Sequence, residues 1–509
     1  SRRGNLFQRG FTRAPGDDEE LILGSSDLLK TFTRLLMTVR GVNFNFSINE
    51  TTLLPGFLPS PFLMGVSNGS INSEFSGAPG IPFTFGSQNR EIHRTAAANG
   101  WLSESIVRND PFTQTRDKKF DFSTNLEPFK GFRMQIRGNY SRGDSYQELY
   151  RPNELGGQFE TQNPFRNGTF GMSFWSFRTG FKRASKVPED NYAYEIFDNM
   201  RFYRGQVVDR LNSSNPSGEA AVYHPNSQDV LIPAFFAAYS GKSVDKLFDK
   251  VSRKGQQTFN PFLQFPMPNW RVDYSGLEKL PVLKKVFDTF SLSHSYSSTY
   301  SVGNFTSSLG QPSDVVNLLA NGYNLGSQTA FGPELGINYF LPVFIMSSIT
   351  MQEKFSPLIG VRFKIKGGKL TGNINYNTER RAVLNLSNSQ VAEYNSKDLV
   401  FGFGFKKSNI KMPFRGRDGN NVVLTNDLNF NFDFTLRDVT ALQRRLDGDA
   451  QPIQGNYNLQ IKPQVQYQFN KKLSMGFYIE HFVNTPFTSL SYETKRTVGG
   501  LNMKFNLAD

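Results

Sequence analysis

Cysteine is absent from this chain of 509 residues. The absence excludes a disulfide framework, thiolate metal sites and a cysteine nucleophile. Long apolar runs are absent as well, because the longest one, residues 231–239, is interrupted by Pro233. A membrane-spanning helix needs about 20 consecutive apolar residues. The sequence therefore excludes helices as membrane spans.

Histidine is scarce, and its four copies lie far apart at His93, His224, His294 and His481. None has a second histidine or a glutamate at the spacing of a zinc site, so no metal site is expected. His294 lies between two serines, but the neighbouring segment offers no residue that would orient its ring. The glycine-rich stretches match no phosphate-binding motif. We therefore expect neither a cofactor nor an enzymatic activity.

Apolar residues make up only 38% of the chain, yet phenylalanine alone occurs 49 times. This combination is typical of transmembrane β-strands, in which every second residue meets lipid while the residues between stay polar. The formal net charge of +13 could indicate nucleic acid binding. However, lysine and arginine are spread among strands and turns without forming a basic stripe. No nucleic acid partner is expected.

The alternation of apolar and polar residues is clearest in the carboxy-terminal third. Side chains of a strand point alternately to opposite faces, so each of these segments has one apolar and one polar face. The residues expected to face lipid are Phe430, Phe432, Phe434, Tyr457, Leu459, Ile461, Phe477 and Ile479. The residues expected to line an aqueous lumen are Asn429, Asn431, Asp433, Gln464, Gln466 and Gln468.

Earlier segments, such as those around Phe44 and Phe132, repeat this pattern and bring the expected number of strands to about a dozen. Several segments match or exceed the ~9–11 residues that cross a bilayer at a tilt. Gly367-Gly368 predicts a tight hairpin. Pro463 cannot donate a hydrogen bond to a neighbouring strand and predicts a bulge or a missing hydrogen bond. The fold class predicted is all-β, a transmembrane antiparallel β-barrel segment.

Three regions are expected, namely first barrel strands with Pro/Gly-rich loops in 1–140, an insertion in 141–288 and carboxy-terminal barrel strands in 289–509. In the insertion the two-residue period fades, and residues 191–211 and 230–253 look partly helical. We expect this region to lie outside the bilayer as a cap or a partner-binding surface. Trp175 and Trp270 are its candidate anchors, since aromatic residues dominate interface energetics.

A basic loop between two strong strands is a second candidate surface. Its cations are Lys406, Lys407, Lys411, Arg415 and Arg417. Such side chains could bind lipopolysaccharide phosphates or an acidic partner through charge-assisted hydrogen bonds. An ordinary exposed loop explains the same residues, and the sequence leaves both interpretations open.

Four Pro/Gly-rich phrases follow one another in the first 272 residues, namely TLLPGFLP at 52–59, GIPFTFGSQ at 80–88, QDVLIPAF at 228–235 and PMPNWRV at 266–272. In this order they resemble the carboxy-terminal part of the SprA family, also called Sov. Members of this family are the outer-membrane translocon barrels of the Bacteroidetes type IX secretion system. The remainder of the chain resembles the family only in its strand pattern.

The resemblance implies that the chain is the final section of a very large outer-membrane barrel. The family exports folded proteins that carry a carboxy-terminal targeting domain, and in some members the adhesins of gliding motility. The implied partners are the remainder of the same barrel, a PorV-type barrel protein, a plug protein, the secreted substrates, and outer-membrane lipid and lipopolysaccharide.

Residues 1–4 carry neither an initiator methionine nor a signal segment, so we expect a piece of a longer chain. Such a piece should not close into a ring, because its edge strands pair with other segments. The final strand, 501–507, is expected beside 490–494 and not beside 34–49.

Two other functions remain open. A fragment of a TonB-dependent transporter or a porin-like barrel would share the alternating strands. A secreted surface adhesin would share them without contacting a membrane. Partitioning separates the two classes, because a barrel needs detergent to stay soluble and an adhesin does not.

Overall fold

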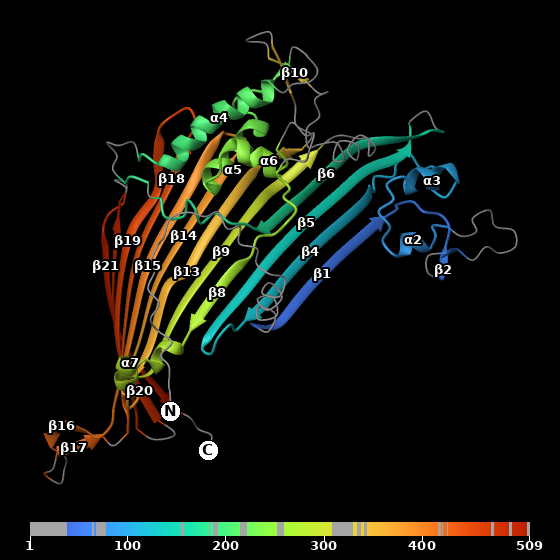
Figure 1. Cartoon of the computed structure of the whole chain (residues 1–509). Coiled ribbons are helices and arrows are strands. Elements are labelled where there is room, and N and C mark those ends of the chain that lie inside the picture. The colour runs from blue at the N-terminus through green and yellow to red at the C-terminus, as the bar shows by residue number, and fades with distance from the viewer. Residues whose placement is uncertain are drawn as a thin grey trace, which may run out of the picture.

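The computed structural model describes residues 38–63, 66–67, 78–153, 157–182, 184–186, 192–213, 221–251, 259–307, 329–332, 337–340, 344–415, 419, 421–424, 426–469, 473–487 and 491–505. Its main body is a 14-stranded antiparallel sheet, which runs across Figure 1 as a single wall. The predicted fold class, an all-β chain of long antiparallel strands with a partly helical insertion, is confirmed.

Twelve strands follow one another across the sheet in chain order. They are β1 (Val39–Leu53), β4 (Phe112–Leu126), β5 (Phe132–Pro152), β6 (Phe159–Ser173), β9 (Phe287–Ser307), β13 (Ser348–Ile365), β14 (Leu370–Asn385), β15 (Gln390–Lys407), β18 (Leu428–Arg445), β19 (Ala450–Gln468), β20 (Leu473–Pro486) and β21 (Thr494–Phe505). Two short strands complete the sheet, β8 (Asn269–Tyr274) beside β5 and β9, and β12 (Ile345–Met346) beside β9.

Small elements occupy the connections. They are the strands β2 (Pro61–Leu63), β3 (Val66–Ser67), β7 (Ala221–Val222), β10 (Thr329–Gly332), β11 (Ile337–Phe340), β16 (Ile410–Arg415) and β17 (Asn421–Leu424), and the helices α2 (Ile81–Thr84), α3 (Ile92–Ala98), η2 (Gly276–Lys279) and α7 (Pro281–Val286). In the described residues no helix has the length and apolar character needed to cross a membrane.

One strand position of the sheet is shared by β6 and β8. β6 lies between β5 and β9 as far as Ser173, and β8 continues in the same place from Asn269. On β5 the partner changes from Met172, opposite Tyr140, to Asn269, opposite Arg137. Residues 174–268 are therefore inserted into the middle of one strand.

The predicted start of the insertion at residue 141 is therefore about thirty residues too early. Within 141–173 lie the upper part of β5 and the whole of β6. Their two-residue period is weak because the apolar face is covered by protein at this height, which buries Tyr146 and Arg166 alike. The helical segments were predicted correctly, as α4 (Glu195–Ser213), α5 (Gln228–Ser240) and α6 (Val244–Val251).

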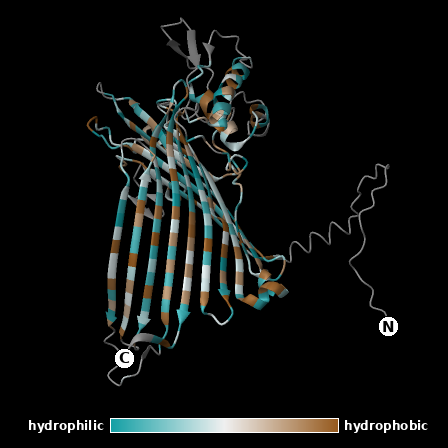
Figure 2. Cartoon of the chain, turned by 90° about the vertical axis from the view of Figure 1, so that its left-hand side faces the viewer, coloured by the Kyte–Doolittle hydropathy of each residue, from teal (hydrophilic) through white to brown (hydrophobic). Residues whose placement is uncertain are grey.

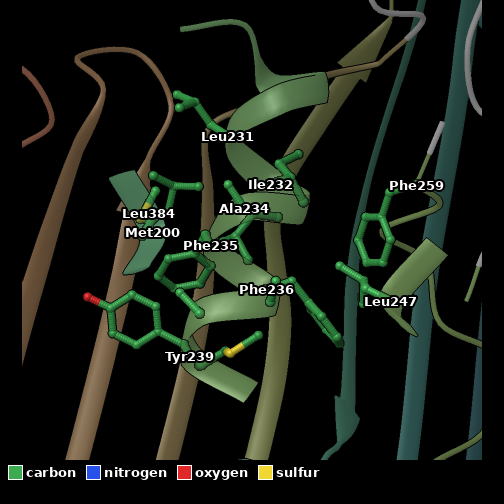
Figure 3. Close-up of a cluster of buried hydrophobic side chains, with 14 of the residues drawn as sticks. Met200, Leu231, Ile232, Ala234, Phe235, Phe236, Tyr239, Leu247, Phe259 and Leu384 are labelled. Carbon is green, nitrogen blue, oxygen red and sulfur yellow. The ribbon is translucent and has the colours of Figure 1, made fainter. Parts of the chain in front are cut away.

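These three helices lie over one face of the sheet at its upper end in Figure 1. Every residue of α5 is buried, which fits a helix that is apolar on all sides. The helix begins after Ser227 and ends at Gly241, whose φ of 69° is the usual left-handed helix end. Figure 3 shows how Phe235 of α5 gathers with Met200 of α4 and Leu384 of β14.

A band of apolar side chains crosses the lower part of the same face. The register places Phe401 opposite Phe434 and Phe434 opposite Ile461, so the apolar rows continue from strand to strand. Along β18 the band runs from Leu428 to Leu436, which is ~27 Å at about 3.4 Å per residue. Figure 2 shows the alternation of hydrophobic and hydrophilic residues along the strands.

The outermost strands of the sheet each have one neighbour. β1 pairs with β4 and β21 pairs with β20, and within the described ranges the two edges do not pair with each other. The prediction that residues 490–494 lie beside the last strand is wrong. Leu501 lies opposite Phe477 and Met503 opposite Met475 on β20, because β21 itself begins at Thr494.

Two local predictions concern single turns and strands. Gly367 and Gly368 have φ values of 83° and 66° and connect β13 to β14, which confirms the tight hairpin. At Pro463 the pairing of β19 with β20 passes from Ile461 to Gln464 without a change of register. The ladder is thus interrupted at the proline, as predicted, but no bulge forms.

Removing the ring of Phe235 should destabilise the helical insertion. Phe235→Ala leaves a cavity between α5 and the sheet and should lower the free energy of unfolding by about 3–5 kcal/mol. Phe202→Ala is the matched control, since Phe202 on α4 is 63% exposed. Guanidinium unfolding in detergent, followed by tryptophan fluorescence, measures both variants. Equal losses in the two variants would contradict the burial of α5.

Candidate functional site

The two faces of the wall carry the residues singled out from the sequence. Phe432 of β18 lies opposite Pro463 of β19, and Val465 lies opposite Phe477 of β20. By strand alternation, all eight side chains expected to face lipid lie on one face. They are Phe430, Phe432, Phe434, Tyr457, Leu459, Ile461, Phe477 and Ile479. The structure therefore brings this set together on one face.

The six polar residues expected to line a lumen share the opposite face. Asn431 lies opposite Gln464 and Asn429 opposite Gln466, while Gln468 continues the row towards β20. Asp433 lies opposite Lys462 on this face. The same face of β9 carries Ser291, Ser293, Ser295, Ser297, Thr299 and Ser301. The face is polar across the sheet.

Charged side chains interrupt the apolar face above the band. Four charged residues lie on the same face as the apolar residues by strand alternation, and all four are buried. They are Glu353 on β13, Arg380 on β14, Glu393 on β15 and Arg444 on β18. A buried charge is tolerated only when it is paired and hydrogen-bonded. These four charges are satisfied by one another across the strands and by residues of the insertion.

Glu353 and Arg380 hold the chain where it leaves β6. Glu353 Oε2 accepts a hydrogen bond from Ser176 Oγ at 2.8 Å, and its Oε1 lies 3.7 Å from Arg380 Nη2. Arg380 Nη1 donates to the carbonyl of Thr179 at 2.9 Å. Thr179 Oγ1 donates in turn to the carbonyl of Tyr239 at 2.5 Å. The first loop of the insertion is thereby fixed to the sheet and to the end of α5.

Glu393 and Arg444 hold the helices from the neighbouring strands. Arg444 Nε lies 2.6 Å from Glu393 Oε2, and Arg444 Nη1 donates to the carbonyl of Tyr192 at 2.6 Å. The hydroxyl of Tyr239 donates to Glu393 Oε1. Burial, together with the charge of Glu393, raises the pKa of Tyr239 well above its ordinary value, so the hydroxyl stays a donor. We call these four charges and their partners the buried clamp.

The buried clamp was not among the features predicted from the sequence. The sequence did contain a signal, because in four separate strands a charged residue occupies a position that alternation assigns to the apolar face. These residues are Glu353, Arg380, Glu393 and Arg444. A charge at such a position in lipid costs roughly 2–4 kcal/mol for lysine or arginine near the midplane. Four such positions at one height would have indicated that protein, and not lipid, covers the upper part of this face.

Trp175 and Trp270 lie close together, with ring centroids 6.2 Å apart. Trp175 is the second residue after the end of β6 and donates from Nε1 to the carbonyl of Pro268 at 2.5 Å. Trp270 belongs to β8 and stacks on Tyr296 of β9 with 4.5 Å between centroids. The pair therefore closes the junction at which the insertion leaves and re-enters the sheet. Whether a partner contacts it stays a prediction.

The basic loop lies at the opposite end of the sheet from the helices (Figure 1). Lys406 Nζ lies 2.5 Å from Asp427 Oδ2, and hydrogen bonds from Lys406 and Ser408 hold the pKa of Asp427 below its ordinary value. Lys407 is exposed at the end of β15. Arg415 ends β16, opposite Asn421 of β17, and Arg417 lies outside the described residues. Lys411 is exposed on β16, opposite Val423 of β17. Binding of phosphates or of an acidic partner by these cations stays a prediction.

The histidines occupy separate environments. His294 Nδ1 lies 2.7 Å from the carbonyl oxygen of Leu358, and its ring is on the apolar face, while the flanking serines point to the polar face. His93 on α3 is buried, with Nε2 2.8 Å from Glu148 Oε1 of β5. The serine–histidine arrangement suggested by the sequence is therefore split between two faces of the sheet.

Asp229 in the first turn of α5 is a buried carboxyl. In the described part of the chain neither of its oxygens has a hydrogen-bond partner. Burial raises its pKa from the usual range to about 7. The neighbouring Gln228 is well satisfied, since its amide bonds the backbone of Phe344 at 2.5 Å and of Met346 at 3.1 Å.

No protein family matches this chain, and no curated protein resembles it closely enough to match. Among solved structures, the outer-membrane protein OmpT of Vibrio cholerae is 6% identical with a TM-score of 0.18, covering 79% of this chain and 94% of OmpT. A chain of the RagAB peptide transporter is 7% identical with a TM-score of 0.24, covering 79% of this chain and 40% of that one.

Breaking the buried clamp should lower the free energy of unfolding far more than breaking an exposed ion pair does. Arg444→Gln leaves the Glu393 carboxylate buried without its cation and should lower the free energy of unfolding by about 3–5 kcal/mol. Arg437→Gln is the control, since its bond with Asp398 joins the same two strands on the polar face, with the arginine half exposed. That variant should lose less than about 1 kcal/mol. Similar losses in a denaturant titration would refute the clamp.

Asp229 should make the insertion less stable as the pH rises. Its folded pKa of about 7 lies above the unfolded value of about 3.9, so the unfolded chain loses its proton first. Between pH 5 and pH 7 the protein should lose about 2 kcal/mol of stability through this group. Asp229→Asn should remove that part of the pH dependence, whereas Asp245→Asn, an exposed residue of α6, should retain it. Unfolding curves at both pH values measure the difference.

Proposed function

We propose that this chain forms part of the wall of an outer-membrane transport barrel, with the apolar band towards lipid and the polar face towards an aqueous lumen. One observation carries the proposal: the apolar rows cross the sheet on one face, while serine, asparagine and glutamine cover the other. The ~27 Å extent of the band along β18 is comparable to the ~25 Å apolar band of known outer-membrane barrels.

The exposure of the band favours lipid over water as its surroundings. Phe44, Phe46, Leu501 and Phe505 are each at least 60% exposed. Soluble proteins rarely leave so large a contiguous apolar surface open to water. A secreted adhesin is therefore the weaker alternative.

The edges of the sheet require further strands in this setting. Unpaired backbone groups in hydrocarbon cost several kcal/mol each, so a sheet in lipid must be closed. In the proposed barrel, β1 and β21 each pair with a segment outside the described residues. These segments belong to the remainder of the same barrel.

The four Pro/Gly-rich phrases support a more specific function, export of folded proteins by type IX secretion. The first begins the connection from β1 to β4, the second lies within that connection, the third begins α5, and the fourth leads into β8. All four thus belong to the connection from β1 to β4 or to the insertion. The secreted substrates would pass along the polar face, while a PorV-type protein and a plug protein would act as further partners. No step in this proposal requires a cofactor.

Single cysteines can test the orientation of the wall, because the chain contains no cysteine of its own. Asp433→Cys and Phe432→Cys are introduced into the full-length protein in its native outer membrane. A membrane-impermeant maleimide should react with position 433, which would face water, and not with position 432, which would face lipid. The two positions are adjacent on one strand, so each serves as the control for the other.

The same variants test export. A secreted protein with a carboxy-terminal targeting domain, carrying a thiol-specific crosslinker, should form an adduct at position 433 and none at position 432. Reaction at 432 alone would reject the orientation of the wall. Labelling at 433 without any cargo adduct would reject protein export and leave a nutrient channel.

A further inference from the structure

A cavity of about 640 Å³ opens on the apolar face, next to the loop before α3. Strands β4, β5 and β6 form its floor, and residues 88–91 form one side. Its cations are Arg90, Arg116, Lys118, Arg142 and Arg166, against two carboxylates, Glu91 and Asp144. The cavity therefore carries an excess of positive charge that the function proposed above does not use.

The floor of this cavity contains a buried guanidinium with free donors. Asp144 Oδ1 accepts from Arg166 Nη2 at 3.0 Å, and Asp144 Oδ2 accepts from Arg142 Nε at 2.9 Å. Arg166 is only 6% exposed, yet its Nε and Nη1 have no hydrogen-bond partner among the described residues. The guanidinium also lies over the ring of Phe344, 5.2 Å from its centroid, so Arg166 places a positive charge beneath the cavity that a bound anion would help to balance.

Two further cations line the cavity without a carboxylate of their own. Within the part of the chain that the structure covers, no carboxylate lies within ion-pairing distance of Arg90 or Lys118. Arg90 lies over the ring of Tyr146, with its guanidinium carbon 5.1 Å from the ring centroid. By contrast, Arg116 is paired with Glu50 at 2.7 Å. Arg90 and Lys118 are therefore available to a bound anion.

The cavity lies directly above the apolar band. Lys118 is opposite Arg142, and the next residues on the same face, Phe120 and Tyr140, lie opposite each other at the top of the band. Phe46 of β1 extends this row, since it lies opposite Phe120. Lipid phosphates occupy the layer immediately outside the hydrocarbon region, where basic side chains meet them.

We propose that this cavity binds the phosphate group of an anionic membrane lipid. The phosphate oxygens accept hydrogen bonds from Arg90 and Lys118, the buried charge of Arg166 attracts the anion from the floor, and the acyl chains extend down over Phe120 and Tyr140. Recognition of phosphate follows from the charges and free donors alone. The choice of a lipid as its carrier rests on the orientation of the wall proposed above.

The test uses the full-length protein in detergent and two probes, phosphatidylglycerol and inorganic phosphate. The double variant Arg90→Gln/Lys118→Gln leaves the buried Arg166 in place. The control is Lys119→Gln, which removes one charge from the next residue of β4, on the opposite face. Native mass spectrometry measures lipid binding, and calorimetry measures binding of inorganic phosphate.

The wild type and Lys119→Gln should bind phosphatidylglycerol alike, and the double variant should bind it about tenfold more weakly or worse. Inorganic phosphate should bind weakly and compete with the lipid. Binding of inorganic phosphate without lipid binding would overturn the lipid assignment, and binding of neither probe would overturn the site. Equal affinity in all three proteins would also overturn it. None of these results depends on the cysteine labelling, so this inference and the proposed function can fail separately.

Discussion

The structure depends on a register that keeps the apolar side chains of every strand on one face. Because strand side chains alternate, a shift of one residue would turn an apolar row to the polar face. Between Phe355 and Val361, β13 has two more residues than the paired stretch of β9. The partners of these two residues on β9, Tyr296 and Leu292, nevertheless lie on the same face. An even insertion bends the strand without exchanging its faces. The band therefore continues across it.

Odd shifts of register occur where the band has ended. In the described sheet they lie at Gln147, Gly168 and Ala441 in the upper part, and at Val39 and Lys364 near the lower ends. Above the band the strands contact the insertion or water, and a local exchange of faces is tolerated. Within the band the register is thus constrained to even shifts, whereas beyond it odd shifts are tolerated.

Much of this arrangement could be predicted from the sequence. The faces of β18 and β19, the Gly367-Gly368 hairpin and the helices α4 to α6 follow from period and turn chemistry alone. The upper part of β5 could not be recognised, because a strand that is covered on its apolar face loses its simple alternation. The shared position of β6 and β8 was also out of reach, since the two strands are 95 residues apart and their union depends on β5 and β9.

The face of the sheet on which the insertion packs limits the roles that the insertion can have. The helices α4 to α6 pack on the face that carries the apolar band, and the buried clamp fixes them there through four strands. If the polar face lines the path of a substrate, the insertion stands outside that path. It cannot then act as a plug in the lumen. Its chain leaves the wall near Trp175 and re-enters it near Trp270. The insertion is better placed to brace the projecting part of the wall and to meet a partner or lipid at the membrane surface.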